Sequence, residues 1–265
     1  MGAFVLNTKS YFLLLKTLIF AHMNIKKHIP NLFTLTNLLS GCILVYVTAL
    51  RITPDKWLQD ESLMNWFLLL VGISLVADFL DGLVARRLNV ASPLGLQLDS
   101  LADMVTFGVF PGLLMVKLLQ MSLGTTQSLI PFIGFTVTLF SALRLAKFNV
   151  DTTQVTFFKG LATPANAILI LGIYISSQNF PEFFQTNGFN LFLATSIISS
   201  FLLVSNIPMF SFKLNSLEWK KHLPQLILII LVLLFLVLFQ WSGLALIIIT
   251  YIILSLIFRK LFVHA

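Results

Sequence analysis

The chain has 265 residues, of which 58% are hydrophobic and only 10% are charged, and its mean hydropathy is +0.96. Soluble domains carry about a quarter charged residues, so this composition excludes an ordinary soluble protein. The single cysteine, Cys42, excludes an intramolecular disulfide and a cysteine metal cluster. We predict one polytopic, all-α membrane helix bundle. Its 17 basic residues against 10 acidic ones then indicate cytoplasmic loops and not a nucleic-acid site.

The N-terminal segment, residues 1–29, is predicted to lie on the membrane surface. Residues 11–21 (YFLLLKTLIFA) are apolar but shorter than the roughly 20 residues that a membrane span needs. No clear signal-peptide cleavage site precedes Asn24, so we expect an interfacial helix with its lysines near the lipid headgroups. Met23 is an alternative start, which leaves open whether residues 1–22 belong to the mature protein.

Apolar stretches along the rest of the chain predict eight membrane spans. They cover residues 32–50, 65–85, 95–118, 129–147, 164–178, 190–207, 224–240 and 242–259. We assign the first six to a core, residues 30–207, and the last two to a C-terminal transmembrane hairpin, residues 208–265. A tight turn near Trp241 separates the two helices of that hairpin.

Loop charge predicts the orientation in the cell membrane. With the N-terminus inside, the cytoplasmic segments hold Lys9, Lys16, Lys26, Lys27, Arg86, Arg87, Arg144, Lys147, Lys159, Lys213, Lys220, Lys221, Arg259 and Lys260. The outer segments hold only Arg51, Lys56 and Lys117. Because positive charge accumulates on the cytoplasmic side, eight spans with both termini inside satisfy the positive-inside rule.

Four aspartates lie at or near the predicted cytoplasmic ends of the second and third spans, in the run DFLDGLVARRLNVASPLGLQLDSLAD. Asp78 and Asp81 are three residues apart, and Asp99 and Asp103 are four apart. Both spacings place a pair of carboxylates on one helix face. The site that they form is therefore expected to face the cytoplasm.

Small residues accompany these aspartates. Gly82 and Ala85 continue the first helix face, and Gly95 begins the second. We expect them to let the two helix backbones approach closely, because the turn at residues 89–93 reverses the chain between the two spans.

Four carboxylates this close cannot all stay ionised in a low dielectric without compensating charge. Their oxygens are hard ligands suited to Mg²⁺ or Mn²⁺, and the absence of His and Cys from the cluster argues against zinc. The alternative is that the aspartates cap helices, pair with arginines or reach the interface. Ionisable residues within spans are functional by default, and four on two facing helices favour a metal site. The histidines show no ligand spacing and lie outside the spans, at His22, His28, His222 and His264.

The aspartate run resembles the signature of the CDP-alcohol phosphatidyltransferase family, D-x-x-D-G-x-x-A-R followed by G-x-x-x-D-x-x-x-D. The matching positions are Asp78, Asp81, Gly82, Ala85, Arg86, Gly95, Asp99 and Asp103. The resemblance covers roughly residues 28–205. It implies a six-helix core that transfers a phosphatidyl group from CDP-diacylglycerol to an alcohol, with Mg²⁺ or Mn²⁺ in a two-metal site. It also implies a homodimer among membrane lipids.

The resemblance assigns catalytic roles to the four aspartates. Asp78, Asp81 and Asp99 would hold the metals, with Asp103 as a shared ligand. Asp103 would also be the general base that takes the proton from the acceptor alcohol. Attack on the lipid-side phosphorus would then expel CMP.

A second stretch, PNLFTLTNLLSG, resembles the part of the family that lines the nucleotide site, although polar residues in a span often only bond between helices. Gly82 would let the nucleotide approach the backbone, and Arg86 would bind a phosphate oxygen unless it is a cytoplasmic anchor, a role that suits Arg87 better. The implied CDP-binding set is Asn31, Thr34, Asn37, Asp78, Gly82, Ala85, Arg86 and Gly95.

Two further stretches, SALRLAKFN and FFKGLATPAN, resemble the phosphatidylserine synthase branch of the family, whose acceptor is L-serine. Arg144, Lys147 and Lys159 would form a cationic group that binds the serine carboxylate or the donor phosphate. Lys147 stands where that branch usually has arginine, and Ala162 where it usually has proline. These two departures weaken the serine assignment more than the family assignment.

Other functions remain open at the level of sequence. The acceptor could be glycerol 3-phosphate, inositol phosphate or choline, although a phosphorylated acceptor would require more arginines than this chain offers. A cation transporter is the alternative from a different class, but its charges should lie near the bilayer midplane, often within internal repeats. An inactive homologue is disfavoured because all four aspartates are present.

Overall fold

The computed structural model describes residues 25–53, 61–151, 158–210 and 223–259. Within these ranges the chain is almost entirely helical, which confirms the predicted all-α class. The strands described there form one short antiparallel pair, β1 (Phe158–Lys159) and β2 (Pro208–Met209). The predicted surface helix at residues 11–21 lies outside the described residues.

The helices follow one another with short connections. In chain order they are α2 (Ile25–Arg51), α3 (Glu61–Arg87), α4 (Pro93–Asp103), η1 (Met104–Val109), α5 (Phe110–Leu123), η2 (Ile130–Phe135), α6 (Thr136–Val150), α7 (Thr163–Asn179), α8 (Pro181–Val204), α9 (Leu223–Phe239), η4 (Gln240–Ser242) and α10 (Gly243–Ile257). The continuous rod α4–η1–α5 is central, since it packs against α2, α6, α7 and α8.

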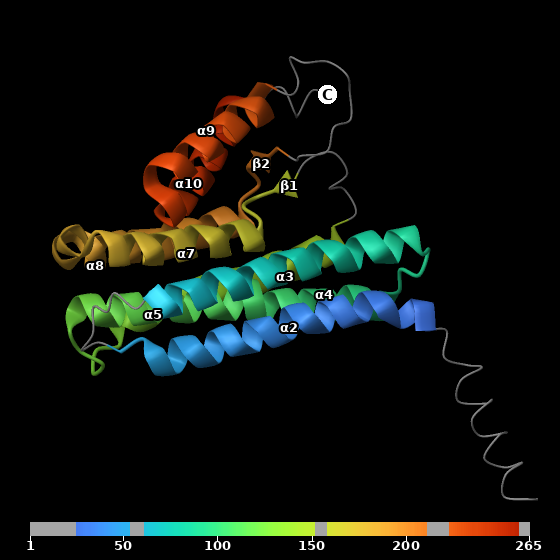
Figure 1. Cartoon of the computed structure of the whole chain (residues 1–265), viewed down its shortest axis with the longest axis horizontal. Coiled ribbons are helices and arrows are strands. Elements are labelled where there is room, and N and C mark those ends of the chain that lie inside the picture. The colour runs from blue at the N-terminus through green and yellow to red at the C-terminus, as the bar shows by residue number, and fades with distance from the viewer. Residues whose placement is uncertain (1–24, 54–60, 152–157, 211–222, 260–265) are drawn as a thin grey trace, which may run out of the picture.

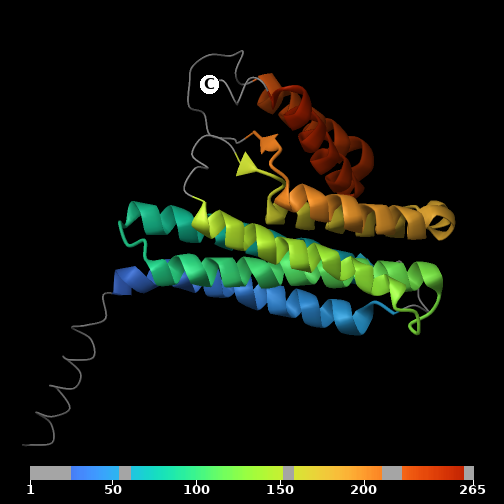
Figure 2. The ribbon, with the colours of Figure 1, turned by 180° about the vertical axis from the view of Figure 1, so that it is seen from behind.

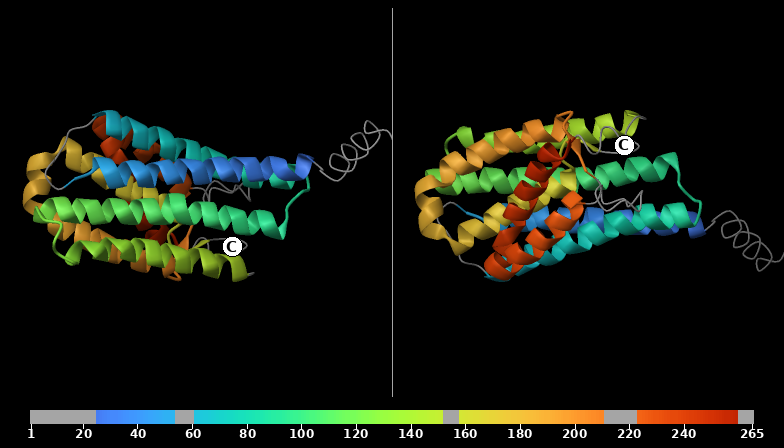
Figure 3. Two further views of the ribbon diagram at one scale, coloured as in Figure 1. Left: turned by 90° about the horizontal axis from the view of Figure 1, so that it is seen from below. Right: turned by 90° about the horizontal axis from the view of Figure 1, so that it is seen from above.

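Figures 1 and 2 show the long helices α2, α3, α5 and α6 running along the long axis, with α7 and α8 layered on them. The hairpin α9–α10 crosses this bundle at an angle and rests on α7 (Figure 3). The η4 turn between α9 and α10 contains Trp241, where a tight turn was predicted. The bundle and the hairpin therefore pack as separate layers.

Six described helical stretches are long and apolar enough to cross a membrane, so the chain is a multi-pass membrane protein. They cover His28–Arg51, Ser62–Arg87, Pro93–Leu123, Ile130–Val150, Pro181–Val204 and Leu223–Ile257. The last stretch contains both helices of the hairpin, and α7, with 17 residues, is shorter than a typical span. The count of eight spans therefore stays a prediction.

One predicted span has a wrong boundary. The sixth was expected over residues 190–207, but α8 already begins at Pro181. The first turns of this helix contain polar residues, among them Glu182 and Asn187. Pro181 favours a helix start here, because the φ angle of proline suits the first position of a helix. Only Phe180 separates α7 from α8.

The rod that carries two of the aspartates is interrupted by a π-helix at Met104–Val109. Pro111 lacks the N–H that would bond one turn back in an α-helix, and the N–H of Phe110 instead donates to the carbonyl of Val105. Such π-bulges often occur at functional sites. This one follows directly after Asp103.

Close packing of α2 against η1 fixes the position of this bulge. A Cβ at Gly41 would collide with the side chain of Thr106, so glycine is needed there for the two backbones to approach. Deeper in the bundle, Phe67 packs against Phe110 and Tyr174, with ring centroids 5.4 Å apart in both pairs. These contacts give the carboxylate-bearing helices a rigid base.

Candidate active site

Two helices supply the four carboxylates. Asp78 and Asp81 lie in the last turns of α3, and Asp99 and Asp103 lie on α4. The connection between these helices reverses the chain as predicted. It ends at Ser92, whose side chain caps α4 by accepting a 3.0 Å hydrogen bond from the N–H of Gly95.

The expected close contact between the backbones of α3 and α4 is wrong. Both helices pack against α2 and have few contacts with each other. A Cβ at Gly82 would meet the guanidinium of Arg86, and one at Gly95 would meet Ser92 and Asn31. The small residues therefore leave open space between α3 and α4 instead of closing it.

Three of the carboxylates converge. Asp78, Asp99 and Asp103 each have one oxygen atom within 4.8 Å of the others. Ionised carboxylates this close to one another repel, and a cation bound between them offsets that repulsion. One oxygen of Asp99, Oδ1, is buried and has no hydrogen-bond partner within the described residues. An all-oxygen set of this kind fits a hard divalent cation.

Asp81 lies beside this group, held by α2. The hydroxyl of Thr34 donates a 2.6 Å hydrogen bond to Asp81 Oδ2, and the carboxylate is only 6% exposed. The three converging carboxylates all belong to the predicted ligand set of Asp78, Asp81, Asp99 and Asp103, and Asp81 is the member outside their cluster. A role for Asp81 in metal binding stays a prediction.

Asp103 is also fixed from α2. The amide nitrogen of Asn37 donates to Asp103 Oδ1 over 3.0 Å, and Asn37 itself is fully buried. The hydroxyl of Thr106 in turn donates a 3.0 Å hydrogen bond to the main-chain carbonyl of Asn37. Because Thr34 and Asn37 are three residues apart, one face of α2 orients a carboxylate from each of the neighbouring helices.

A pocket of about 310 Å³ opens between α2, α3 and α4. Its lining combines a carboxylate edge, formed by Asp81 and Asp99, with the guanidinium of Arg86. The predicted nucleotide residues that line it are Asn31, Thr34, Gly82, Ala85, Arg86 and Gly95. Asn37 and Asp78, from the same predicted set, do not line it. The pocket can therefore receive a phosphate-bearing group next to the carboxylates.

The three predicted cations come together in a smaller cavity of about 50 Å³ at the ends of α6 and α8. Arg144 is 9% exposed and interacts electrostatically with Asp103, which links this cavity to the carboxylates. Lys147 lines the same cavity, and Lys159 forms a 3.1 Å ion pair with Asp151. The cationic group therefore lies on the carboxylate side, as expected.

Sequence reasoning missed several polar residues here. Nothing in the sequence except their opposite charges indicated that Asp151 and Lys159 form an ion pair. Ser100 and Asn149 bond to each other across α4 and α6, with Asn149 Nδ2 donating to the Ser100 hydroxyl over 2.8 Å. Asn149 ends the RLAKFN stretch, so that motif could have marked it.

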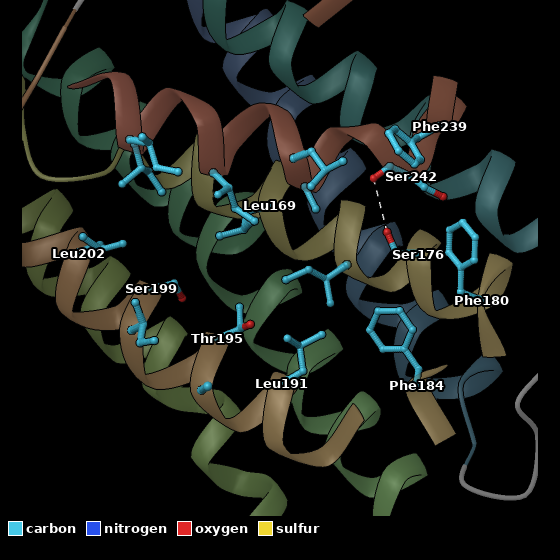
Figure 4. A pocket seen from close by; sticks show the side chains of 18 residues that line it. Leu169, Ser176, Phe180, Phe184, Leu191, Thr195, Ser199, Leu202, Phe239 and Ser242 are labelled. Atoms are coloured by element: carbon cyan, nitrogen blue, oxygen red, sulfur yellow. Dashed lines mark hydrogen bonds between the residues drawn. The ribbon is translucent and has the colours of Figure 1, made fainter. Parts of the chain in front are cut away.

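A larger groove, of about 550 Å³, lies between α7, α8 and the C-terminal hairpin. Figure 4 shows its lining of leucine, isoleucine and phenylalanine side chains, with the hydroxyls of Ser176 and Thr195 among the few polar groups. It has no charged side chain in its lining. Chemistry on a charged substrate is therefore directed to the pocket beside the aspartates.

Comparison with known proteins agrees with this geometry. A family model described as CDP-alcohol phosphatidyltransferase matches residues 27–202, which span all four aspartates. The chain is 34% identical to a CDP-diacylglycerol–serine O-phosphatidyltransferase of Helicobacter pylori (strain J99) over 78% of the chain and 81% of that protein. The enzyme of that name from Mycobacterium tuberculosis (strain H37Rv) is 34% identical over 68% of the chain and 60% of its own length. The one from Methanocaldococcus jannaschii is 37% identical over 48% and 57%. The chain is therefore an enzyme of the CDP-alcohol phosphatidyltransferase family.

Proposed function

We propose that this enzyme transfers the phosphatidyl group of CDP-diacylglycerol to L-serine and releases phosphatidylserine and CMP. The observation that carries the proposal is the convergence of Asp78, Asp99 and Asp103 beside a phosphate-sized pocket. The choice of serine is supported by relatives that carry the serine transferase name. It is also supported by the cationic cavity, whose Arg144 interacts electrostatically with Asp103.

The donor would lie in the pocket between α2, α3 and α4. Asn31 and Thr34 would bind the nucleotide, Arg86 would bind a phosphate oxygen, and Gly82 would leave room at the backbone. Asp78, Asp81, Asp99 and Asp103 would hold Mg²⁺ or Mn²⁺. Bound divalent cations supply charge neutralisation for the pyrophosphate and for the departing CMP.

Asp103 is the proposed general base. Its Oδ1 is oriented by Asn37, which leaves Oδ2 free of that bond to accept a proton. As the serine hydroxyl gives its proton to Asp103, its oxygen forms a bond to the lipid-side phosphorus, and the bond from that phosphorus to the CMP oxygen breaks. The electron pair of the broken bond leaves with CMP. A positioned base of this kind contributes about 10²–10⁴-fold to the rate.

Arg144, Lys147 and Lys159 would bind the serine carboxylate. Charge-assisted hydrogen bonds are the stronger kind, and Arg144 is the member that interacts with Asp103. The four carboxylates lie in the halves of their spans that are nearer to Arg86, at the end of α3, and to Pro93, at the start of α4. We propose that this end faces the cytoplasm in the cell membrane. A homodimer remains an expectation from the family.

The test compares serine with serinol, which lacks the carboxylate, in a CMP-release assay on purified enzyme with CDP-diacylglycerol. Wild type should prefer serine. The preference for serine over serinol should fall by about 10–150-fold in Arg144→Ala, and also in Lys147→Ala or in Lys159→Ala. Each substitution removes a charge-assisted hydrogen bond of about 1.5–3 kcal/mol. Arg87→Ala is the control, because this exposed arginine does not line either cavity. Equal rates with serine and serinol in wild type, or activity with glycerol 3-phosphate or inositol phosphate alone, would refute the serine assignment.

A further inference from the structure

Buried polar side chains without partners gather on α6 and α7. The hydroxyls of Ser141 and Thr163, and both the amide nitrogen and oxygen of Asn166, have no hydrogen-bond partner within the described residues. All three residues are 0% exposed. Nε of Arg144, one helical turn after Ser141, is unpartnered as well.

This pattern is costly, and several other serines of the same bundle avoid it. Serine and threonine within helices usually donate to the carbonyl four residues earlier. Ser176 does so to Gly172, and Ser196 does so to Phe192, each over 2.8 Å. Buried polar groups left without partners are rare in native proteins and need an explanation. An asparagine with both ends unpartnered is the strongest case, because it loses donors and an acceptor together.

These side chains lie on the two helices, α6 and α7, that pack against η1, the segment directly after Asp103. Arg144 interacts electrostatically with Asp103, and Ser141 is on the same face of α6, where a Cβ at Gly108 of η1 would press against it. Helix α7 packs against both η1 and α6. Thr163 and Asn166 are one turn apart at the start of α7, so they share a face at this junction.

The start of α7 is held firmly in place. The N–H of Gly160 donates to the carbonyl of Ile207, and that of Leu161 donates to the carbonyl of Leu202, each over 2.9 Å. Lys159, immediately before, lines the cationic cavity with Arg144. The chain thus enters α7 from the cationic cavity, while Ser141, Thr163 and Asn166 do not line the nucleotide-side pocket.

We propose that Asn166, supported by Thr163 and Ser141, binds the acceptor alcohol on the α6–α7 side of Asp103. An amide offers two donors and one acceptor, so Asn166 can bind both the carboxylate and the ammonium group of an amino-acid acceptor. The chemical class is a small zwitterion that carries a hydroxyl. This inference rests on the proposed function and adds to it the residues that select the acceptor.

The decisive variant is Asn166→Leu, which keeps the branched shape of the side chain and removes its hydrogen bonding. Its KM for serine should rise about tenfold or more, and tenfold corresponds to about 1.4 kcal/mol. Its KM for CDP-diacylglycerol should stay within twofold of wild type. Because an unpartnered buried amide destabilises the free protein, the midpoint of thermal unfolding should rise by about 2–4 °C.

Asn179→Leu is the matched control at the other end of α7. Asn179 has a partner, the hydroxyl of Ser242, to which its amide nitrogen donates over 2.8 Å. Its replacement should lower the unfolding midpoint and leave the KM for serine unchanged. If Asn166 had a purely structural role, Asn166→Leu would likewise lower the unfolding midpoint and leave the KM for serine unchanged. If Asn166 binds the acceptor, the unfolding midpoints of the two variants should shift in opposite directions.

A serine KM for Asn166→Leu within twofold of wild type overturns the inference, whatever the unfolding midpoint does. If that variant fails to bind CDP, Thr163→Val and Ser141→Ala carry the test under the same criterion. If wild type uses another alcohol instead of serine, the serine proposal fails. The KM for the alcohol that it does use then decides the role of Asn166.

Discussion

The bond from Thr34 to Asp81 gives a sharp test of how α2 prepares the site. Thr34→Val removes the hydroxyl that donates over 2.6 Å and nearly preserves the shape of the side chain. Asp81 is 6% exposed, so water replaces the lost donor incompletely. A hydrogen bond to a charged group contributes about 1.5–3 kcal/mol. At about 1.36 kcal/mol for each factor of ten, kcat/KM for CDP-diacylglycerol should fall by about 10–150-fold.

The assay measures CMP release from purified enzyme over a range of donor and Mg²⁺ concentrations. If Asp81 shares in cation binding, the Mg²⁺ concentration for half-maximal activity should rise as well. Thr36→Val is the control on the same helix, since Thr36 is exposed and its hydroxyl bonds only to the carbonyl of Leu32. Activity of Thr34→Val within threefold of wild type, with unchanged Mg²⁺ dependence, would refute the reasoning.

Three further predictions concern the base, the metal and the topology. Asp103→Asn should lower turnover by about 10²–10⁴-fold while the donor still binds; unchanged turnover at saturating donor would show that Asp103 is not the base. Excess EDTA should abolish CMP release, and added Mg²⁺ or Mn²⁺ should restore it, because the converging carboxylates of Asp78, Asp99 and Asp103 repel one another without a cation. Full activity in EDTA would contradict the metal site. Single cysteines placed at Lys159 and Lys117 should be labelled from the cytoplasmic and outer faces respectively, and the opposite pattern would reverse the orientation.

Local spacing was enough to predict which carboxylates share a face of α3 or α4, and that Thr34 and Asn37 share a face of α2. The steps of three and four residues between the aspartates, and between Thr34 and Asn37, fix which side chains share a helix face. The pairings themselves, Thr34 with Asp81 and Asn37 with Asp103, were not predicted, because the sequence assigned Thr34 and Asn37 to the nucleotide. The length of the apolar runs also predicted the helices that carry them, because a run of about 20 apolar residues indicates a membrane-spanning helix.

Contacts between distant helices could not be predicted in this way. Gly82 and Gly95 indicated close packing, but whether a small residue closes an interface or opens a pocket depends on the third helix, α2. The unpartnered Asn166 was invisible for the same reason, since the sequence stretch FFKGLATPAN gives no sign of which of its residues find hydrogen bonds. The boundary of α8 was missed because tertiary packing and Pro181 outweigh a polar first turn.

Identification of the lipid product tests the central claim most directly. Purified enzyme would be incubated with CDP-diacylglycerol, Mg²⁺ and isotope-labelled L-serine, and both CMP and the lipid product would be measured by mass spectrometry. The account predicts labelled phosphatidylserine in a one-to-one ratio with CMP, and neither product with Asp103→Asn above a hundredth of the wild-type rate, about the smallest effect expected of a lost base. Two results would contradict the proposed function. One is release of CMP with no label in the lipid, and the other is formation of a lipid product only when another alcohol replaces serine.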